Sequence, residues 1–569
     1  MPSARSITLT RVSHLFPGLA ASLLMAWSPA LLAAAQQHDH AAPSGAAAGS
    51  SVCTAPGFGK VHHPVKTSNP QAQRLFEQAM ALDYGFNHNQ AEQCFRQATQ
   101  VDPKMAMAYW GIALVLGTNY NLPVDAEREK LAYQNVQKAL ELSANGPRNE
   151  RDYIEALAKR YTDQPNPDYD RLEAAYHDAM REVYKRYPDD LDAATLFAES
   201  GMNLHPWKLY DHAGQPAPGT GEILAVLRSV LKRDPNHLGA NHFYIHAVEA
   251  STHPEAALAS AQRLAGLAPA SGHLVHMPSH TYIRTGDHES GEQTNIAAVR
   301  VDDAYFSIAH PQGIYPLMYY THNIHFIAAE NAFLGNYAAS LQAAKRAQEH
   351  VAPYVKEMSM VDAFYSLPLQ IMVRFHRWNE IMALPQPDES HPVTAVAWHY
   401  ARALAAANNS QLDQARTELA ALHAAAPEMA KIPLNSTGVH NSEAIPQMMS
   451  EIVQARLASA QHESDAAIKH LQTAVSLEDT LDYNEPPDWL APTRESLGAA
   501  LLAAGKAGEA EAIFREDLKR NPRNPRSLFG LAEALKSEHK MAEAATIQQQ
   551  FQRAWRKADT KLTISDLQL

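Results

Sequence analysis

Histidine is the residue type whose spacing in this sequence is most suggestive of chemistry. The chain has 29 histidines among 569 residues, and several of them gather in one central stretch. There they recur at intervals of three or four residues, which places side chains on one face of a helix. The histidines concerned are His242, His246, His273, His276, His280, His322 and His325. Imidazoles one helical turn apart can hold the same transition-metal ion.

These histidines occupy equivalent positions in three successive predicted helices. The helices can be aligned on the turns that end them, at Thr252, Gly286 and Gly335. Every one of the seven histidines then lies six, ten or thirteen residues before its turn. Histidines scattered at random would not lie at the same distances from the turn in three successive helices. We therefore predict that the imidazoles of neighbouring helices converge on a shared volume and bind one or two transition-metal ions there.

Two carboxylates are expected near the histidines. Glu249 follows His246 by three residues and extends the same helix face, and Glu199 is expected on the preceding repeat. Either could act as a ligand or carry a proton in catalysis. A nitrogen-rich ligand set suits zinc, copper or iron, and equally manganese or nickel, rather than calcium or magnesium. Met277, beside His276, is a weak indication of copper, although its thioether could serve packing alone.

The elements that must position these residues are predicted to be helices in a repeated pair. The clearest unit combines Gly498 and Ala510, small residues that let two helices approach, with a turn at Gly505 and a stop at Pro522. Similar units precede and follow it. The pattern resembles the tetratricopeptide repeat (TPR), whose period is roughly 34 residues.

The TPR resemblance implies an all-α fold, a right-handed superhelical solenoid of antiparallel helix pairs. It covers residues 70–560, with a histidine-rich centre at 190–345 and the best-formed repeats at 485–557. Insertions are expected around 205–220, 375–395 and 430–445. Because the first helix of each pair lines the concave surface of such a solenoid, the histidines are expected in a concave groove.

Three functions are compatible with this arrangement. A metalloenzyme, either a hydrolase or an oxidoreductase, would use the ion to activate water or dioxygen. A carrier or store would hold the metal without a substrate pocket. A TPR scaffold would bind a peptide or partner protein without metal. The segment from Gly272 to His280, GHLVHMPSH, resembles a signature of a secreted TPR subgroup and carries an expectation of fold but of no reaction.

A second constellation, weaker than the first, lies between Tyr483 and Trp489. This segment, YNEPPDW, contains two adjacent prolines together with aromatic and charged side chains. We expect it either to present those side chains towards the concave axis or to pack between repeats and cap the next helix.

The N-terminus is typical of an export signal. Arg5 and Arg11 precede an apolar stretch that ends in small residues, so residues 1–35 are predicted to be a signal peptide, cut after Ala35. Residues 36–69 are predicted to form a flexible leader. No later segment has the roughly 20 unbroken apolar residues that cross a bilayer. The mature protein is therefore expected to be periplasmic or secreted, without membrane insertion.

Cysteine and charge limit the remaining possibilities. Cys53 and Cys94 are the only cysteines, and they could form a disulfide or remain one exposed and one buried thiol. The formal net charge is −13, and no run of Lys and Arg is present. We therefore expect no nucleic-acid partner, because phosphate binding needs a clustered basic face.

Overall fold

The computed structural model describes residues 52–388, 390–432 and 441–569. The predicted signal peptide and residues 36–51 of the predicted leader lie outside the described residues. Within the described ranges the regular structure consists of helices, and no strand is formed. The all-α prediction is confirmed.

The helices follow one another along the chain with short connections. In the first half they are η1 (Val52–Thr54), α2 (Pro70–Asp83), α3 (His88–Val101), α4 (Ala106–Leu116), α5 (Ala126–Ser143), α6 (Arg148–Leu157), η2 (Ala158–Arg160), α7 (Tyr169–Arg186), α8 (Leu191–Met202), α9 (Thr220–Arg233), α10 (Leu238–Glu249), η3 (Pro254–Ala257), α11 (Leu258–Leu267), α12 (Gly272–His276), α13 (Pro278–Thr285) and α14 (His288–Ala309). In the second half they are η4 (Tyr315–Tyr319), α15 (Tyr320–Phe333), α16 (Tyr337–Val351), η5 (Ala352–Tyr354), η6 (Ser359–Val361), α17 (Asp362–Tyr365), α18 (Leu367–Arg374), α19 (Trp378–Ala383), α20 (Pro392–Asn408), α21 (Leu412–Met429), α22 (Ala444–Ala460), α23 (Ser464–Glu478), α24 (Thr493–Ala503), α25 (Ala507–Arg520), α26 (Pro525–Ser537), α27 (Met541–Ala554) and η7 (Ile564–Leu567).

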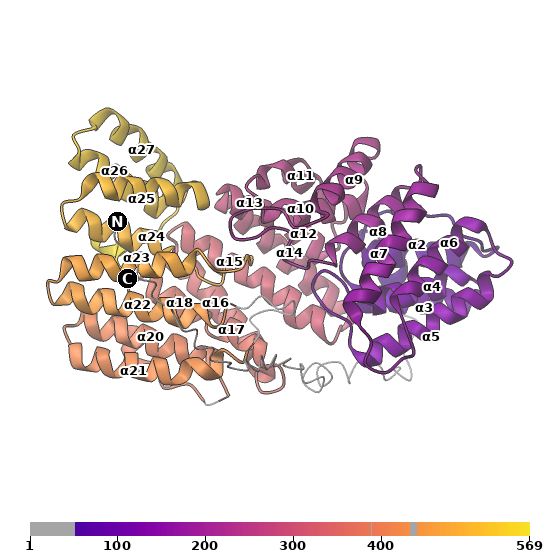
Figure 1. Cartoon of the computed structure of the whole chain (residues 1–569), viewed down its shortest axis with the longest axis horizontal. Helices are drawn as coiled ribbons and strands as arrows, with labels where there is room; N and C mark the ends of the chain where they lie inside the picture. Colours follow the sequence, from indigo (N-terminus) through magenta and orange to yellow (C-terminus); the bar gives the residue numbers. More distant parts are fainter. Residues whose placement is uncertain (1–51, 389, 433–440) are drawn as a thin grey trace, which may run out of the picture.

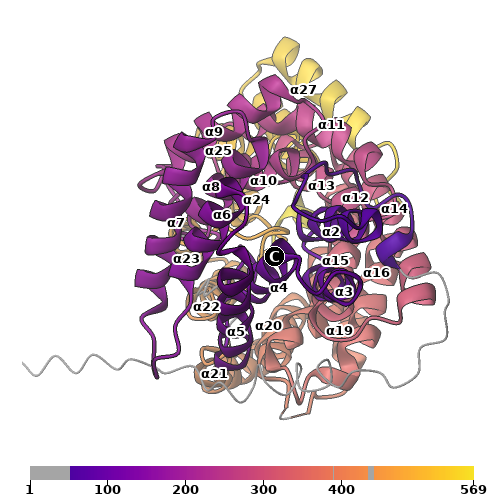
Figure 2. The same cartoon turned by 90° about the vertical axis from the view of Figure 1, so that its right-hand side faces the viewer.

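Neighbouring helices pack as pairs, and the pairs stack in chain order from α2 to α27. Figure 1 shows the stack as an elongated body with the early helices at one end and the late helices at the other. Seen end-on in Figure 2, the pairs wind around a common axis. The protein is thus a TPR-like helical solenoid. The predicted insertions coincide with longer connections, such as the one between α8 and α9.

Small residues allow the close helix contacts that the repeat pattern predicted. A Cβ atom added to Gly498 on α24 would lie 2.4 Å from the ring of Phe514, and one added to Gly530 on α26 would lie 2.2 Å from the same ring. The ring of Phe514, on α25, therefore fills the space that both glycines leave. Gly505 adopts φ 74° at the turn between α24 and α25, a left-handed conformation that costs glycine least.

The helices that carry the histidines are held together by a buried carboxyl. Asp302 on α14 accepts hydrogen bonds from Tyr315 in η4 (3.0 Å) and Asn323 in α15 (2.9 Å). The same carboxyl contacts the start of α12 so closely that a Cβ on Gly272 would lie 2.0 Å from its Oδ1. Burial raises the pKa of Asp302 to about 7. Asp302 thereby sets the positions of α12, η4 and α15 relative to α14.

Residues 52–69, the described part of the predicted leader, form an N-terminal strap over these helices. Cys53 and Cys94 are joined by a disulfide, so the first of the two cysteine alternatives is observed. Further along the strap, the carbonyl of Gly57 accepts a 2.8 Å hydrogen bond from the backbone of Ala270, just before α12. The strap is therefore packed against the solenoid, because covalent and backbone bonds compensate for its few apolar side chains.

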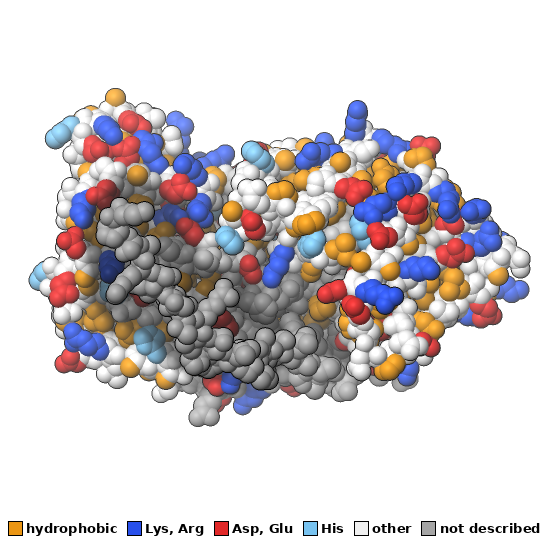
Figure 3. All heavy atoms as spheres, in the orientation of Figure 1, with side chains coloured by type: hydrophobic (Ala, Val, Ile, Leu, Met, Phe, Trp, Pro, Cys, Tyr) orange, Lys and Arg blue, Asp and Glu red, His pale blue; other side chains and the backbone are white. Residues whose placement is uncertain are grey.

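Two features of the surface bear on the sequence predictions. None of the helices in the described part of the chain is long and apolar enough to cross a membrane. On the face drawn in Figure 3, acidic and basic side chains are interspersed and neither sign dominates.

The disulfide generates a prediction about stability. Replacing both Cys53 and Cys94 by Ser should lower the melting temperature, because a bridge over 41 residues removes up to about 4 kcal/mol of unfolded-chain entropy. Calorimetry of the wild type and the double variant, with and without dithiothreitol, measures the effect. The chain has no other cysteine, so reductant should change the wild type alone. A variant that still responds to reductant would contradict this assignment.

Candidate metal centre

The seven predicted histidines lie on consecutive first helices of three pairs, α10, α12–α13 and α15. Pro278, which lacks a backbone N–H, divides the middle helix into α12 and α13. His276 and His280 nevertheless remain one turn apart across this break. The five histidines of α10, α12 and α13 are each at most 2% exposed, whereas His322 and His325 are half-buried. The histidines of α10, α12 and α13 are therefore almost fully buried between helices.

Six of the seven histidines converge in two groups of three. The first histidine trio consists of His242, His246 and His273. The second histidine trio consists of His276, His280 and His322. Within each trio, one nitrogen from each ring lies within 4.8 Å of the others, a spacing from which small movements reach metal-ligand distances.

In the second trio, the rings of His276 and His280 are oriented with their Nε2 atoms facing each other. The Nδ1 atom of His276 lies 2.6 Å from the side-chain oxygen of Asn295 on α14, so this nitrogen carries the proton. The Nδ1 atom of His280 lies 2.5 Å from Oε2 of Glu249 and, although this contact departs from ideal hydrogen-bond geometry, a carboxylate again favours the proton on Nδ1. The two Nε2 atoms lie only 2.8 Å apart. If both rings carry the proton on Nδ1, two lone pairs point at each other, and a cation between them removes the repulsion.

The first trio is oriented in the same way. The carbonyl oxygen of Tyr84 lies 2.7 Å from Nδ1 of His242, and Oε1 of Glu249 lies 2.8 Å from Nδ1 of His246. Both acceptors place the proton on Nδ1 and leave Nε2 free. The Nε2 atom of His246 has no hydrogen-bond partner among the described residues, and Nε2 of His242 faces Nε2 of His273 at 3.1 Å. Partners of this kind, which fix the tautomer and ring orientation, are typical of metal-bound histidines.

Glu249 connects the two trios. One of its carboxylate oxygens contacts His246 of the first trio and the other contacts His280 of the second. The carboxylate is 2% exposed; burial tends to raise its pKa, but the two rings lower it to about 2. Glu249 was predicted as a catalytic group or ligand. The structure shows both oxygens engaged with ring Nδ1 atoms, which makes Glu249 a residue that positions two histidines.

Four of the six imidazoles are held in the neutral form that can bind metal. Burial lowers the pKa values of His242, His273, His276 and His322 well below the ordinary histidine value, and the neighbouring rings lower them further. A neutral imidazole keeps one nitrogen lone pair available for coordination at neutral pH.

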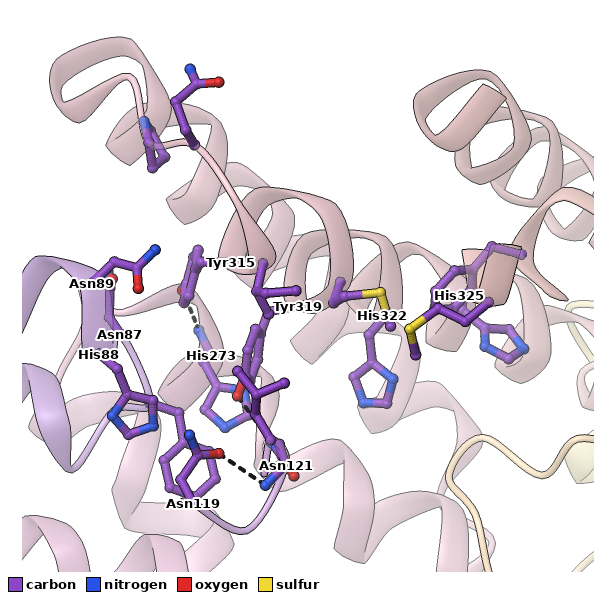
Figure 4. Close-up of a pocket in the computed structure, with 18 of the residues that line it drawn as sticks. Asn87, His88, Asn89, Asn119, Asn121, His273, Tyr315, Tyr319, His322 and His325 are labelled. Carbon is purple, nitrogen blue, oxygen red and sulfur yellow. Dashed lines mark hydrogen bonds between the residues drawn. The ribbon is translucent and has the colours of Figure 1, made fainter. Parts of the chain in front are cut away.

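A cavity of about 1400 Å³ opens beside the two trios. His246 and His273 of the first trio and His280 and His322 of the second line its wall. Figure 4 shows His273 and His322 on this wall, with Tyr315 and Tyr319 between α3 and α15. Both trios are therefore accessible to a molecule in the cavity.

Two of the predicted site residues lie apart from the trios. Glu199 accepts a hydrogen bond from Asn203 on its own helix, and its pKa is raised to about 7 by burial. It lines a separate small pocket together with Phe86 and does not line the cavity beside the trios, so the structure does not bring it together with the histidines. His325 lines the cavity but belongs to neither trio.

The segment from Tyr483 to Trp489 was expected either to present side chains towards the concave axis or to pack between repeats, and each is observed in part. Asn484, Glu485 and Asp488 line the cavity, whereas Trp489 is buried against Tyr400 with ring centroids 5.7 Å apart. Glu485 is 4% exposed, and burial raises its pKa to about 8 against the opposing charge of Arg284. A carboxyl that is protonated at neutral pH therefore lies in the cavity wall.

Several residues of the site were missed by the sequence analysis. Asn295 and the carbonyl of Tyr84 orient histidines, and the ring of Phe86 packs on three of them, 4.4 Å from His242, 5.8 Å from His246 and 5.4 Å from His273 between centroids. The contact made by a backbone carbonyl cannot be predicted from the residue type, because every residue has one. Asn295 and Phe86 lie on helices or turns without a histidine pattern, so spacing alone gave no signal.

No protein-family model matches this chain, and no curated protein sequence matches it. Among solved structures, the chain is similar to the human IFIT1 dimer with m7Gppp-AAAA, at 13% identity over 86% of this chain and 91% of that one, with a TM-score of 0.33. It is also similar to yeast Tom70 (11% identity, 85% and 91% covered, TM-score 0.30) and to the P58(IPK) TPR domain (13%, 82% and 98%, TM-score 0.23). At these TM-scores the similarities carry no argument about function.

The raised pKa of Glu485 predicts a pH dependence in the metal-free protein. Between its ordinary value of about 4.5 and about 8, the unfolded chain releases a proton that the native state retains. The stabilising contribution of the protonated carboxyl is therefore complete below pH 4.5 and is lost as pH rises towards and beyond 8, by at most about 1.4 kcal/mol per pH unit. Thermal unfolding of EDTA-treated protein across this range should show a shallower decline for Glu485→Gln than for the wild type. Glu92→Gln, at the partly exposed rim of the cavity, serves as the control; identical profiles for all three proteins would remove the assignment.

Proposed function

We propose that this protein binds two transition-metal ions, one in each histidine trio, and presents them to a ligand in the adjoining cavity. The observation that carries the proposal is the 2.8 Å separation of the His276 and His280 Nε2 atoms, whose protons are drawn to the opposite ring nitrogens by Asn295 and Glu249. Hydrogen bonding alone does not account for such an arrangement when both rings carry their proton on Nδ1. A bound cation does.

The charge of the interior supports the same proposal. Glu249 is an ionised carboxylate in a nearly dry environment, and its two immediate partners are imidazoles whose neighbours are also imidazoles. An uncompensated buried anion is costly. Cations in the trios would compensate it without any change in the fold.

A metalloenzyme is the favoured form of this function. Three histidines leave at least one coordination position open, and in such a site the ion can lower the pKa of bound water or bind dioxygen. The chain's own contribution would be to fix the imidazoles through Glu249, Asn295 and the Tyr84 carbonyl. The protonated carboxyl of Glu485, in the same cavity wall, could donate a proton to a bound ligand.

An exported location is part of the proposal. The basic and apolar N-terminal stretch supports it, and so does the disulfide between Cys53 and Cys94, since disulfides persist in oxidising compartments.

A second candidate function, peptide binding without metal, is favoured by one observation. Asn89, Gln93, Gln97 and Gln100 form a stripe along α3 and line the cavity. Amide side chains both donate and accept hydrogen bonds, as the backbone of an extended peptide requires. A peptide in the cavity is also compatible with the metal centre, as its substrate.

Metal content tests the proposal. Protein purified without a histidine tag and dialysed against zinc, copper or iron should contain two ions per chain by inductively coupled plasma mass spectrometry. His273→Ala and His322→Ala should each lose one ion, because each removes a ligand that reaches the cavity from a different trio. Glu249→Gln should weaken both sites by about 10- to 100-fold, since it removes the charge that orients one histidine in each.

The matched control is His399→Ala, which removes a partly exposed histidine that pairs with Glu418 on the neighbouring helix α21. It should retain both ions. Equal metal content in the wild type, His273→Ala and His322→Ala would refute the proposal, and helical circular dichroism confirms that each variant is folded.

A further inference from the structure

The cavity wall beside the second histidine trio combines thioethers with imidazoles. Met318 lies in η4, which runs directly into α15, and His322 and His325 follow it at intervals of four and three residues. This spacing places the three side chains on one face. All three line the cavity.

A second thioether reaches the same region from another part of the chain. Met360 lies in η6 and also lines the cavity. It belongs to a small apolar cluster against which Met318 packs, together with Phe364 of α17, whose ring lies 5.8 Å from that of His325. Figure 4 shows sulfur atoms near His322 and His325 in the wall of the cavity.

His325 has a ring nitrogen that belongs to neither trio. Its Nε2 atom is buried and has no hydrogen-bond partner among the described residues. A buried polar atom of this kind is costly unless something binds it. His325 is also the one predicted metal ligand that the two trios leave out.

The chemistry of this group differs from that of the trios. Thioethers are soft, uncharged donors that bind Cu(I) and have little affinity for zinc or iron in their common divalent states. An imidazole completes a ligand set of low charge that suits a monovalent ion. We infer that Met318, Met360 and His325 form a third metal site, selective for Cu(I), in the wall of the cavity beside the second trio.

This inference goes beyond the proposed function, because it concerns other ligands and another ion. It also indicates how metal could reach the histidine trios. An ion held by Met318 and His325 would lie one helical turn from His322, a ligand of the second trio. The cavity would then receive copper in its reduced form and pass it to the histidines.

Anaerobic titration with Cu(I) tests the inference. Metal-free wild-type protein is titrated against the chelator bicinchoninate, in parallel with the double variant Met318→Leu/Met360→Leu. Leucine is close in volume to methionine, so the apolar cluster is preserved while both sulfur atoms are removed. The variant should lose one Cu(I) equivalent or bind it at least tenfold more weakly.

Two further measurements make the result decisive. Met429→Leu/Met449→Leu, which removes two other cavity-lining thioethers from a separate apolar cluster, should leave Cu(I) binding unchanged. X-ray absorption of the Cu(I) protein should show sulfur neighbours in the wild type and lose them in Met318→Leu/Met360→Leu. Unchanged Cu(I) binding in that variant, or an absence of sulfur neighbours in the wild type, would overturn the inference.

Binding of Co(II) to the trios, measured on the same samples, separates the two proposals. If Co(II) binds normally while the thioether variant retains Cu(I), the third site is wrong and the trios stand. If Co(II) does not bind but Cu(I) binding still depends on the thioethers, the trios are wrong and the third site stands.

Discussion

The arrangement of the histidines in the interior depends on a single carboxylate that contacts two helices. Glu249 ends α10, contacts His246 on its own helix, and contacts His280 on α13 across the helix interface. Its charge is buried, so it needs both partners, and each partner is thereby held with the proton on Nδ1. The direction in which the Nε2 atoms point follows from this requirement. Glu249 thus orients one ring in each trio, while the Tyr84 carbonyl and Asn295 orient His242 and His276.

The helix packing supports that orientation through a second buried carboxyl. Asp302 fixes the start of α12 and the π-helical turn before α15 relative to α14, and Asn295 on the same helix orients His276. One helix of the solenoid thus sets the position of ligands from two others. The second helix of one pair, α14, therefore holds both α12, from its own pair, and α15, the first helix of the next pair.

The sequence was most informative where a pattern repeats. Equal spacing from Thr252, Gly286 and Gly335 predicted that these histidines would come together, and the structure brings His242, His246 and His273 into one trio and His276, His280 and His322 into another. The same logic gave no guidance for Glu199, whose helix has no histidine pattern to fix its register, or for aromatic neighbours such as Phe86 and Trp207, which pack against the rings. The disulfide that attaches the strap was one of the two alternatives for Cys53 and Cys94, whereas its backbone hydrogen bond to Ala270 left no signal in the sequence.

The N-terminal strap also sets an order of assembly. Its contacts join the beginning of the described chain to residues as distant as Ala270 and Tyr305, which lie next to or within the helices around the histidines. These contacts cannot form until more than two hundred further residues have emerged and folded, and such long-range closures are slow. The strap can therefore dock only after residues up to Tyr305 have been made. If the protein is exported as an unfolded chain, as proposed, the strap docks on the helices around the histidine trios only outside the compartment of synthesis, where the bridge between Cys53 and Cys94 can form. Any ions bound by the trios would then be drawn from the supply on that side of the membrane.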